Sequence, residues 1–87
     1  MQTEYLYTVE EWEYDEVLNE NIHMYTLDLT KALDKIEELM DKPYPNGKTP
    51  REFHELMKPC DDVPRHYSHS GRYGYTSDFY VFKTKLD

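Results

Sequence analysis

The stretch DLTKALDKIEELM, residues 28–40, carries the clearest structural signal of this 87-residue chain. Its apolar residues recur at the i, i+3, i+4 and i+7 spacing of an amphipathic helix. These residues are Leu29, Ala32, Leu33, Ile36, Leu39 and Met40. Asp28 can accept hydrogen bonds from the free amides of the first turn. The stretch therefore predicts one main helix, with an apolar face and a charged opposite face.

Two segments before this helix are predicted to be strands. Residues 5–9 alternate and are rich in aromatic and β-branched side chains, and residues 22–27 form a second such run. The two would pair as a hairpin around a polar turn over residues 15–21. The ring positions change parity at Trp12 and Tyr14, which indicates a bulge or the end of the first strand.

The segment after the main helix contains a loop and the start of a second helix. Residues 42–48 hold two prolines and an Asn-Gly pair, which favour a loop. Thr49 can cap the following turn, Pro50 suits its first position, and Glu52 completes a capping box. Pro59 would end this short helix. Its short apolar stripe would consist of Phe53, Leu56 and Met57.

The last part of the chain is predicted to be irregular and then extended. Residues 60–77 are polar and contain Pro and Gly, whereas residues 79–86 are typical of a strand. Lys83 and Lys85 would protect that strand as a sheet edge. The expected fold class is α+β, a single domain over residues 1–87. It has an antiparallel sheet of three or four strands and two helices, in the order β-β-α-α-β.

The charge of the chain is strongly uneven. There are 18 acidic and 10 basic residues, which gives a formal net charge of −8. Residues 1–20 hold seven of the acids and no Lys or Arg. Negative charge repels phosphate, so direct binding to nucleic acid or to an anionic membrane is not expected. A basic protein partner is favoured instead.

Other classes of protein are excluded by missing signals. No apolar run is long enough for a transmembrane helix, and residues 1–5 do not resemble a signal peptide. Cys60 is the one cysteine, so no internal disulfide is expected, and this favours a cytoplasmic location. The sequence has no glycine-rich phosphate loop, HExxH or GxSxG motif. We therefore expect no enzyme activity and no cofactor.

The main candidate binding surface is the acidic, ring-bearing segment at the end of the first strand. It consists of Glu10, Glu11, Trp12, Glu13, Tyr14, Asp15 and Glu16. Alternate residues of a strand lie about 6.8 Å apart on one side. Glu11, Glu13 and Asp15 would then form a row that matches every second phosphate of a DNA strand. Trp12 and Tyr14 would lie on the opposite side, either as exposed anchors or as part of the core.

A second candidate contact patch lies in the irregular segment. It contains Tyr67, Tyr73 and Tyr75 together with Arg72. Tyrosine is enriched at binding sites because its rigid ring carries a polar hydroxyl. The alternative is that a chain poor in leucine uses tyrosine to fill its core.

One metal-binding alternative comes from the histidines. His54, Cys60, His66 and His69 are ligand types that zinc accepts. Their spacing of six, six and three residues matches no standard zinc finger. A metal-binding module therefore stays a minor alternative.

These features favour a non-catalytic acidic binding protein. We expect an inhibitor that blocks a basic nucleic-acid-binding protein, such as a nuclease or effector complex, by protein contact or DNA mimicry. Small size and acidic charge are typical of phage-encoded proteins that block host defence, including anti-CRISPR and anti-restriction proteins. The alternative in the same class is an antitoxin that neutralises a basic ribonuclease toxin. A thin core and exposed rings are also compatible with a homodimer.

Overall fold

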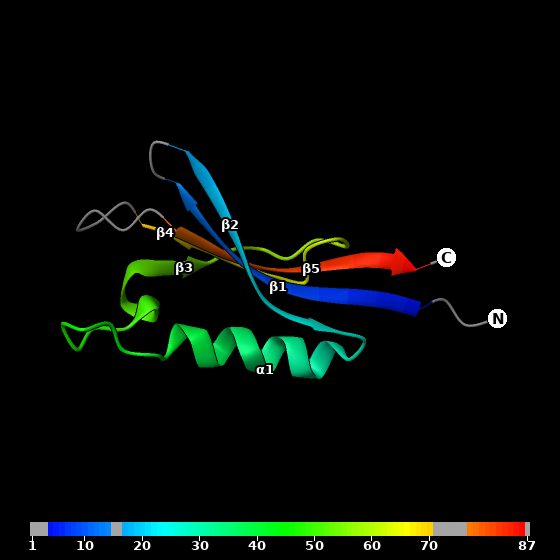
Figure 1. Ribbon diagram of the computed structural model, residues 1–87, viewed down its shortest axis with the longest axis horizontal. Helices are drawn as coiled ribbons and strands as arrows, with labels where there is room; N and C mark the ends of the chain where they lie inside the picture. The colour runs from blue at the N-terminus through cyan, green and yellow to red at the C-terminus, as the bar shows by residue number, and fades with distance from the viewer. Residues whose placement is uncertain (1–3, 15–16, 71–76, 87) are drawn as a thin grey trace.

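The computed structural model describes residues 4–14, 17–70 and 77–86. Within them, five antiparallel strands form one sheet, and α1 lies along one of its faces (Figure 1). The elements in chain order are β1 (Glu4–Tyr14), β2 (Leu18–Thr26), α1 (Leu29–Met40), the 3-10 turn η1 (Pro50–Phe53), β3 (His54–Leu56), β4 (Arg65–His69) and β5 (Ser77–Leu86). The strand order is β2-β1-β5-β4-β3, so β5 is the central strand.

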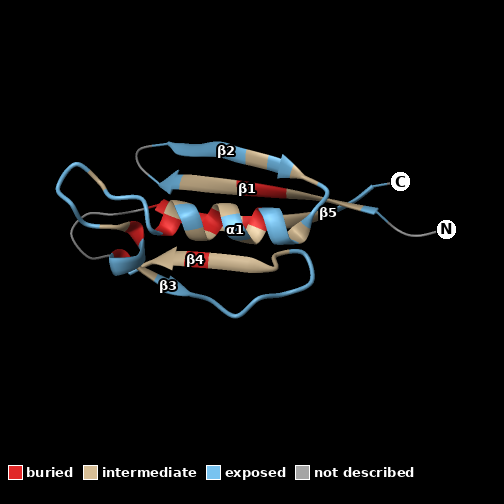
Figure 2. Cartoon of the chain, turned by 90° about the horizontal axis from the view of Figure 1, so that it is seen from below, coloured by how far each residue is buried: buried red, intermediate tan, exposed pale blue. Residues whose placement is uncertain are grey.

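The helix predicted over residues 28–40 is confirmed as α1. The Asp28 carboxylate accepts a hydrogen bond of 2.9 Å from the Thr30 amide and caps its first turn. The apolar face of α1 packs on alternate residues of the sheet, and these side chains form the core: Val9, Ala32, Ile36, Met40, Tyr67, Phe79 and Val81. Figure 2 looks onto this covered face and shows buried positions on α1, on the strands β1 and β4, and on the 3-10 turn η1.

The predicted order β-β-α-α-β, with three or four strands and two helices, is wrong: the described residues form five strands and one α-helix. The second helix is a single 3-10 turn, and the chain leaves it directly into β3. The capping box of Thr49 and Glu52 does form, so the local signal is real. The expected apolar stripe does not form, because Leu56 and Met57 are exposed. The backbone instead pairs with β4, a strand inside the segment that was expected to be irregular.

The last strand also differs from its prediction. It is not an edge, since β1 pairs along almost its whole length and β4 pairs with Val81, Tyr80 and Phe79. Lys83 and Lys85 therefore do not protect a sheet edge. The Lys83 ammonium lies 4.1 Å from the centre of the Tyr5 ring, where it makes a cation–π contact.

The first hairpin is present, with longer strands than expected. β2 begins at Leu18, within the stretch that was predicted to be a turn. The register of β1 against β2 shifts between Val9 and Glu10, which is the mark of a bulge. Against β5, however, β1 runs in one unbroken register from Glu4 to Glu13. Side chains of β1 therefore keep alternating between the two faces up to its end.

An ion-pair cluster joins α1 to β4 and η1. The Glu37 carboxylate accepts hydrogen bonds from the Tyr67 hydroxyl, from Arg51 at 2.7 Å and from Arg65. Burial would raise the pKa of Glu37, but the hydrogen bond from Tyr67 and the two guanidinium groups outweigh it and lower the pKa below 4.5. Tyr67 is thus a buried structural residue, and its ring is not presented to a partner.

Candidate interaction surface

The second face of the sheet is rich in rings. α1, the one α-helix of the described residues, lies on the other side. Cross-strand pairing places on this second face side chains from β1, β2, β4 and β5. We call it the open face and define it by Trp12, Tyr14, Ile22, Tyr25, His66, Tyr80 and Phe82.

Tyr80 is the centre of the ring cluster on the open face. It stacks on His66 with ring centroids 4.2 Å apart and on Phe82 at 4.8 Å. The Trp12 ring is tilted against Tyr80, with centroids 5.0 Å apart, and against Phe82, with centroids 5.6 Å apart. Ring pairs of this kind stabilise each other by about 0.5–1.5 kcal/mol beyond burial. The cluster is therefore a platform of mutually packed, half-exposed rings.

A buried carboxylate lies beside this platform. Asp78 Oδ1 accepts hydrogen bonds from the backbone amide of His69 at 3.0 Å and from its Nδ1 at 2.6 Å. Asp78 Oδ2 accepts from the Tyr80 hydroxyl at 3.2 Å and lies 3.4 Å from His66 Nε2. Burial would raise the pKa of Asp78, but the hydrogen bonds from His69 and His66 outweigh it and lower the pKa below 3.8. The carboxylate is thus ionised at neutral pH.

The Tyr80 hydroxyl links this carboxylate to the rim of the platform. Its oxygen lies 3.3 Å from the Tyr14 hydroxyl, which donates to it because Tyr80 donates to Asp78. Burial raises the pKa of Tyr80 above its usual range, with help from the Tyr14 hydrogen bond and the charge of Asp78. Tyr80 therefore stays a neutral donor, and no buried side-chain nitrogen or oxygen of the described residues lacks a partner.

A shallow, wide-open groove of about 460 Å³ crosses the open face above β1, between β2 and β5. Its apolar walls are Trp12, Ile22, Tyr25 and Phe82, and the carboxylates of Glu10 and Asp62 border it. The Glu10 carboxylate is held in place, since Thr8 Oγ1 donates to it at 2.9 Å and Trp12 Nε1 at 3.1 Å. The groove thus combines aromatic walls with an oriented negative charge.

The acidic segment singled out in the sequence is divided between the two faces. Glu10, Trp12 and Tyr14 lie on the open face, whereas Glu11 and Glu13 lie on the helix side, in line with the alternation expected for a strand. None of the described carboxylates of β1 forms an ion pair with Lys or Arg. The other predicted contact residues lie outside the described residues: Asp15, Glu16, Arg72, Tyr73 and Tyr75.

The predicted phosphate-like row is not formed by equivalent groups. Glu11 Oε1 lies 3.0 Å from His23 Nε2, and its side chain is only 20% exposed. β1 is paired on both sides, so its acids do not project from a free strand edge. Glu13 remains an exposed carboxylate on the helix side.

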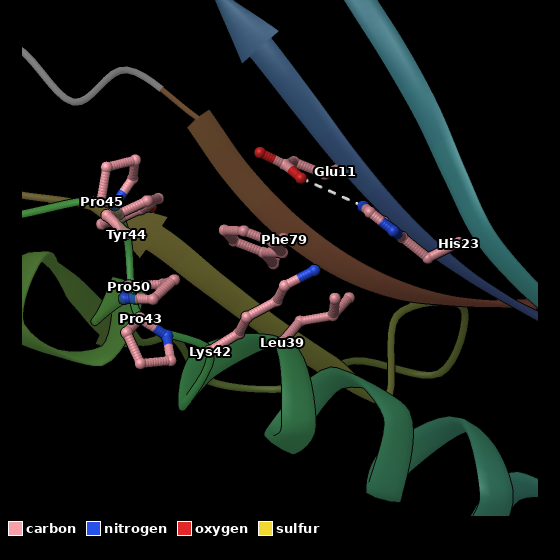
Figure 3. A pocket seen from close by; sticks show the side chains of 9 residues that line it. All are labelled: Glu11, His23, Leu39, Lys42, Pro43, Tyr44, Pro45, Pro50 and Phe79. Carbon is pink, nitrogen blue, oxygen red and sulfur yellow. Dashed lines mark hydrogen bonds and ion pairs between the residues drawn. The ribbon is translucent and has the colours of Figure 1, made fainter. Parts of the chain in front are cut away.

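A smaller pocket of about 220 Å³ lies on the helix side, under the loop after α1. Figure 3 shows the Glu11–His23 pair on one side of it and the Lys42 ammonium directed toward Phe79 and His23. Tyr44 and three prolines complete the apolar lining. The lining contains no Ser, Thr or Cys. No signal in the sequence indicated His23, because the bulge in the β1–β2 pairing decides its position.

The four predicted metal ligands are not brought together. Both ring nitrogens of His54 face backbone carbonyls, at 2.6 Å from Pro50 and 2.7 Å from Ser77. His66 and His69 both approach Asp78, and Cys60 is exposed. Over the residues that the structure describes, no three His, Cys, Asp or Glu side chains are arranged to hold a metal ion.

Comparisons of the chain with protein-family models, with curated proteins and with solved structures found no match. The described residues also contain no helix of the length and apolarity needed to cross a membrane. What the chain binds is therefore inferred from its own geometry and charge.

Proposed function

We propose that this protein is a non-catalytic binding protein that docks its open face onto a basic, nucleic-acid-handling protein and blocks it. The observation that carries this proposal is the aromatic platform itself. Trp12, Tyr14 and Tyr25 are the residue types that dominate binding energy at protein interfaces. Ile22 and Tyr25 are 48% and 61% exposed, so the platform continues into apolar surface that is open to solvent. A contiguous patch of this kind is typical of an interaction site.

The charge around the platform selects the partner. Glu10 lies on the open face, Glu20 shares it through its pairing with Trp12, and Asp62 borders the groove. Together with the net charge of −8, these carboxylates attract a cationic surface and repel phosphate. A protein surface rich in Arg and Lys that normally holds nucleic acid fits this pattern. A phage-encoded inhibitor of a defence nuclease is the class of protein that we favour.

Direct contact is better supported than DNA mimicry. Mimicry needs a row of equivalent, exposed carboxylates, and Glu11 is occupied by His23. The open face instead offers rings surrounded by acids, which is the arrangement of a protein interface with an apolar centre and a polar rim.

A capture experiment with matched variants tests the proposal. The wild-type chain, the double variant Ile22→Ser/Tyr25→Ser and the control Leu56→Ser are immobilised and exposed to bacterial lysate at low and high salt. Leu56 is 61% exposed on β3, away from the platform, so the control removes exposed apolar surface from another part of the molecule. We expect a basic nucleic-acid-binding protein to be retained by wild type and control at low salt and lost with the double variant.

The captured protein is then purified and its DNA binding is measured with each chain added. Loss of DNA binding with wild type and control, but not with the double variant, would support the proposal. Equal inhibition by all three chains, or capture of acidic and neutral proteins only, would contradict it.

A further inference from the structure

We propose that the groove on the open face receives an arginine side chain of the partner, which stacks on the aromatic wall and pairs with Glu10. This inference rests on the proposed function, because it names the chemical group by which the partner is recognised. It also goes beyond that function, since a basic surface could be met by diffuse charge alone. The groove would give the partner's cation a defined position and would favour arginine over lysine.

The walls of the groove suit a flat cation. Trp12 and Phe82 contact each other at 5.6 Å and form one continuous aromatic surface, and Tyr25 faces the same space. A guanidinium over a tryptophan face is attracted by the ring quadrupole, and Trp is the strongest of the aromatic partners. Ile22 adds an aliphatic wall against which the methylene stem of the arginine can pack.

The carboxylate of Glu10 is oriented before any partner arrives. Thr8 donates to Oε2 and Trp12 donates to Oε1, so each oxygen accepts one internal hydrogen bond. Each carboxylate oxygen has a second lone pair, which leaves a two-oxygen acceptor for the fork of an arginine. A group that is held in place loses little conformational entropy on binding.

The lysine that lines the groove does not fill this site. Lys83 contributes to the lining, but its ammonium lies over the ring of Tyr5. Tyr5 belongs to the helix side of β1, so the Lys83 charge is directed away from Glu10. The negative end of the groove is therefore left for a cation from outside, and Asp62 offers a second, exposed carboxylate.

Arginine is favoured over lysine by the same geometry. A guanidinium is planar, stacks on rings, is weakly hydrated and pairs with a carboxylate through two parallel hydrogen bonds. An ammonium can lie over a ring, as that of Lys83 does, but it does not stack flat on it or pair with a carboxylate through two parallel hydrogen bonds. A nucleobase would also stack on the rings, but its phosphates would meet Glu10 and the net negative charge.

Trp12 is the single tryptophan of the chain, so its fluorescence reports directly on the groove. Two peptides are titrated into the full-length protein: one carries three arginines separated by Gly and Ser, and the other carries lysines at the same positions. We expect the arginine peptide to bind about five-fold more tightly, from roughly 1 kcal/mol of two-point pairing with Glu10 that a lysine cannot make. A single-stranded oligonucleotide serves as a third probe, and we expect no change in fluorescence.

A matched pair of variants tests whether the preference for arginine depends on Glu10. Glu10→Gln removes the charge in the groove and keeps an oxygen that can accept from Trp12, while Glu13→Gln removes one charge from the same strand on the other face. We expect the arginine preference to disappear in Glu10→Gln and to persist in Glu13→Gln. Thermal unfolding by circular dichroism verifies that both variants are folded.

Several results would overturn this inference. Equal affinity for the two peptides, absence of binding, a preference that survives Glu10→Gln, or a larger response to the oligonucleotide would each do so. None of these results refutes the proposed function, which fails only if the capture and DNA-binding experiment fails. The two experiments therefore separate a wrong groove assignment from a wrong function.

Discussion

The two faces of the sheet are built from the same strands but have different roles. On the covered face, β1 and β5 place Val9 and Val81 against Ile36 of α1, and all three side chains are fully buried. On the open face, the neighbouring residues Glu10, Tyr80 and Phe82 of the same strands are half-exposed. Close packing against a helix stabilises the fold, whereas a supported aromatic platform keeps its apolar surface available to a partner.

The comparison is most sharply tested by removing the same side chain from each face. Ile36→Ala leaves a cavity in a fully buried site, and we expect the free energy of unfolding to fall by about 2–5 kcal/mol. Ile22→Ala, at a side chain that is 48% exposed, should cost much less. Urea unfolding followed by circular dichroism measures both. Similar losses at the two positions would mean that the open face is also part of the core.

The polar support of the platform should give the next largest effect. Asp78→Asn removes the negative charge to which His69 and His66 donate hydrogen bonds. The new side-chain amide would place an N–H donor opposite the N–H of one of these histidines. We expect a loss of about 1–3 kcal/mol in the free energy of unfolding. The control Glu55→Gln changes an exposed carboxylate on β3 and should leave stability unchanged. An Asp78→Asn variant as stable as this control would show that the buried carboxylate is not needed.

The same carboxylate makes a prediction for acid. Because the pKa of Asp78 is lower in the folded chain than the ordinary 3.8, its contribution is complete above that value. The contribution is lost as the pH falls through the lowered folded pKa. We therefore expect wild type to lose stability steeply below pH 3.8, and the difference between wild type and Asp78→Asn to shrink there. Glu37, whose pKa is also lowered, leaves a shallower slope in the variant. Parallel pH profiles for the two proteins would contradict this assignment.

The covered face could be predicted from the sequence much better than the open one. α1 follows from a helical period and a cap within one continuous stretch, and both signals are local. The separation of Glu11 and Glu13 from Trp12 follows from the pleat of a single strand. By contrast, β4 has the sequence RHYSH, which lacks β-branched residues, and its pairing partners β3 and β5 make it a strand.

The candidate site depends on strand order, which no local pattern contains. Trp12, His66 and Tyr80 are far apart in sequence and meet only because β5 lies between β1 and β4. The lysines of β5 predicted an edge strand, and with that order the ring cluster could not be found. The helix predicted from the capping box at residues 49–52 failed for a related reason. The box starts a turn, but the extended pairing of β3 with β4 decides the conformation of the next residues.

The substitutions that should weaken partner binding most are also expected to change stability least. The double variant Ile22→Ser/Tyr25→Ser changes exposed side chains of β2, so we expect each substitution to shift the free energy of unfolding by no more than about 0.5 kcal/mol. The same substitutions remove one wall of the groove and the exposed margin of the platform, and partner capture should be lost. Unfolding curves and capture measured on the same preparation provide the test. If the variant loses stability and binding together, Ile22 and Tyr25 would be needed for folding. The assignment of stability to the covered face and of binding to the open face would then be wrong.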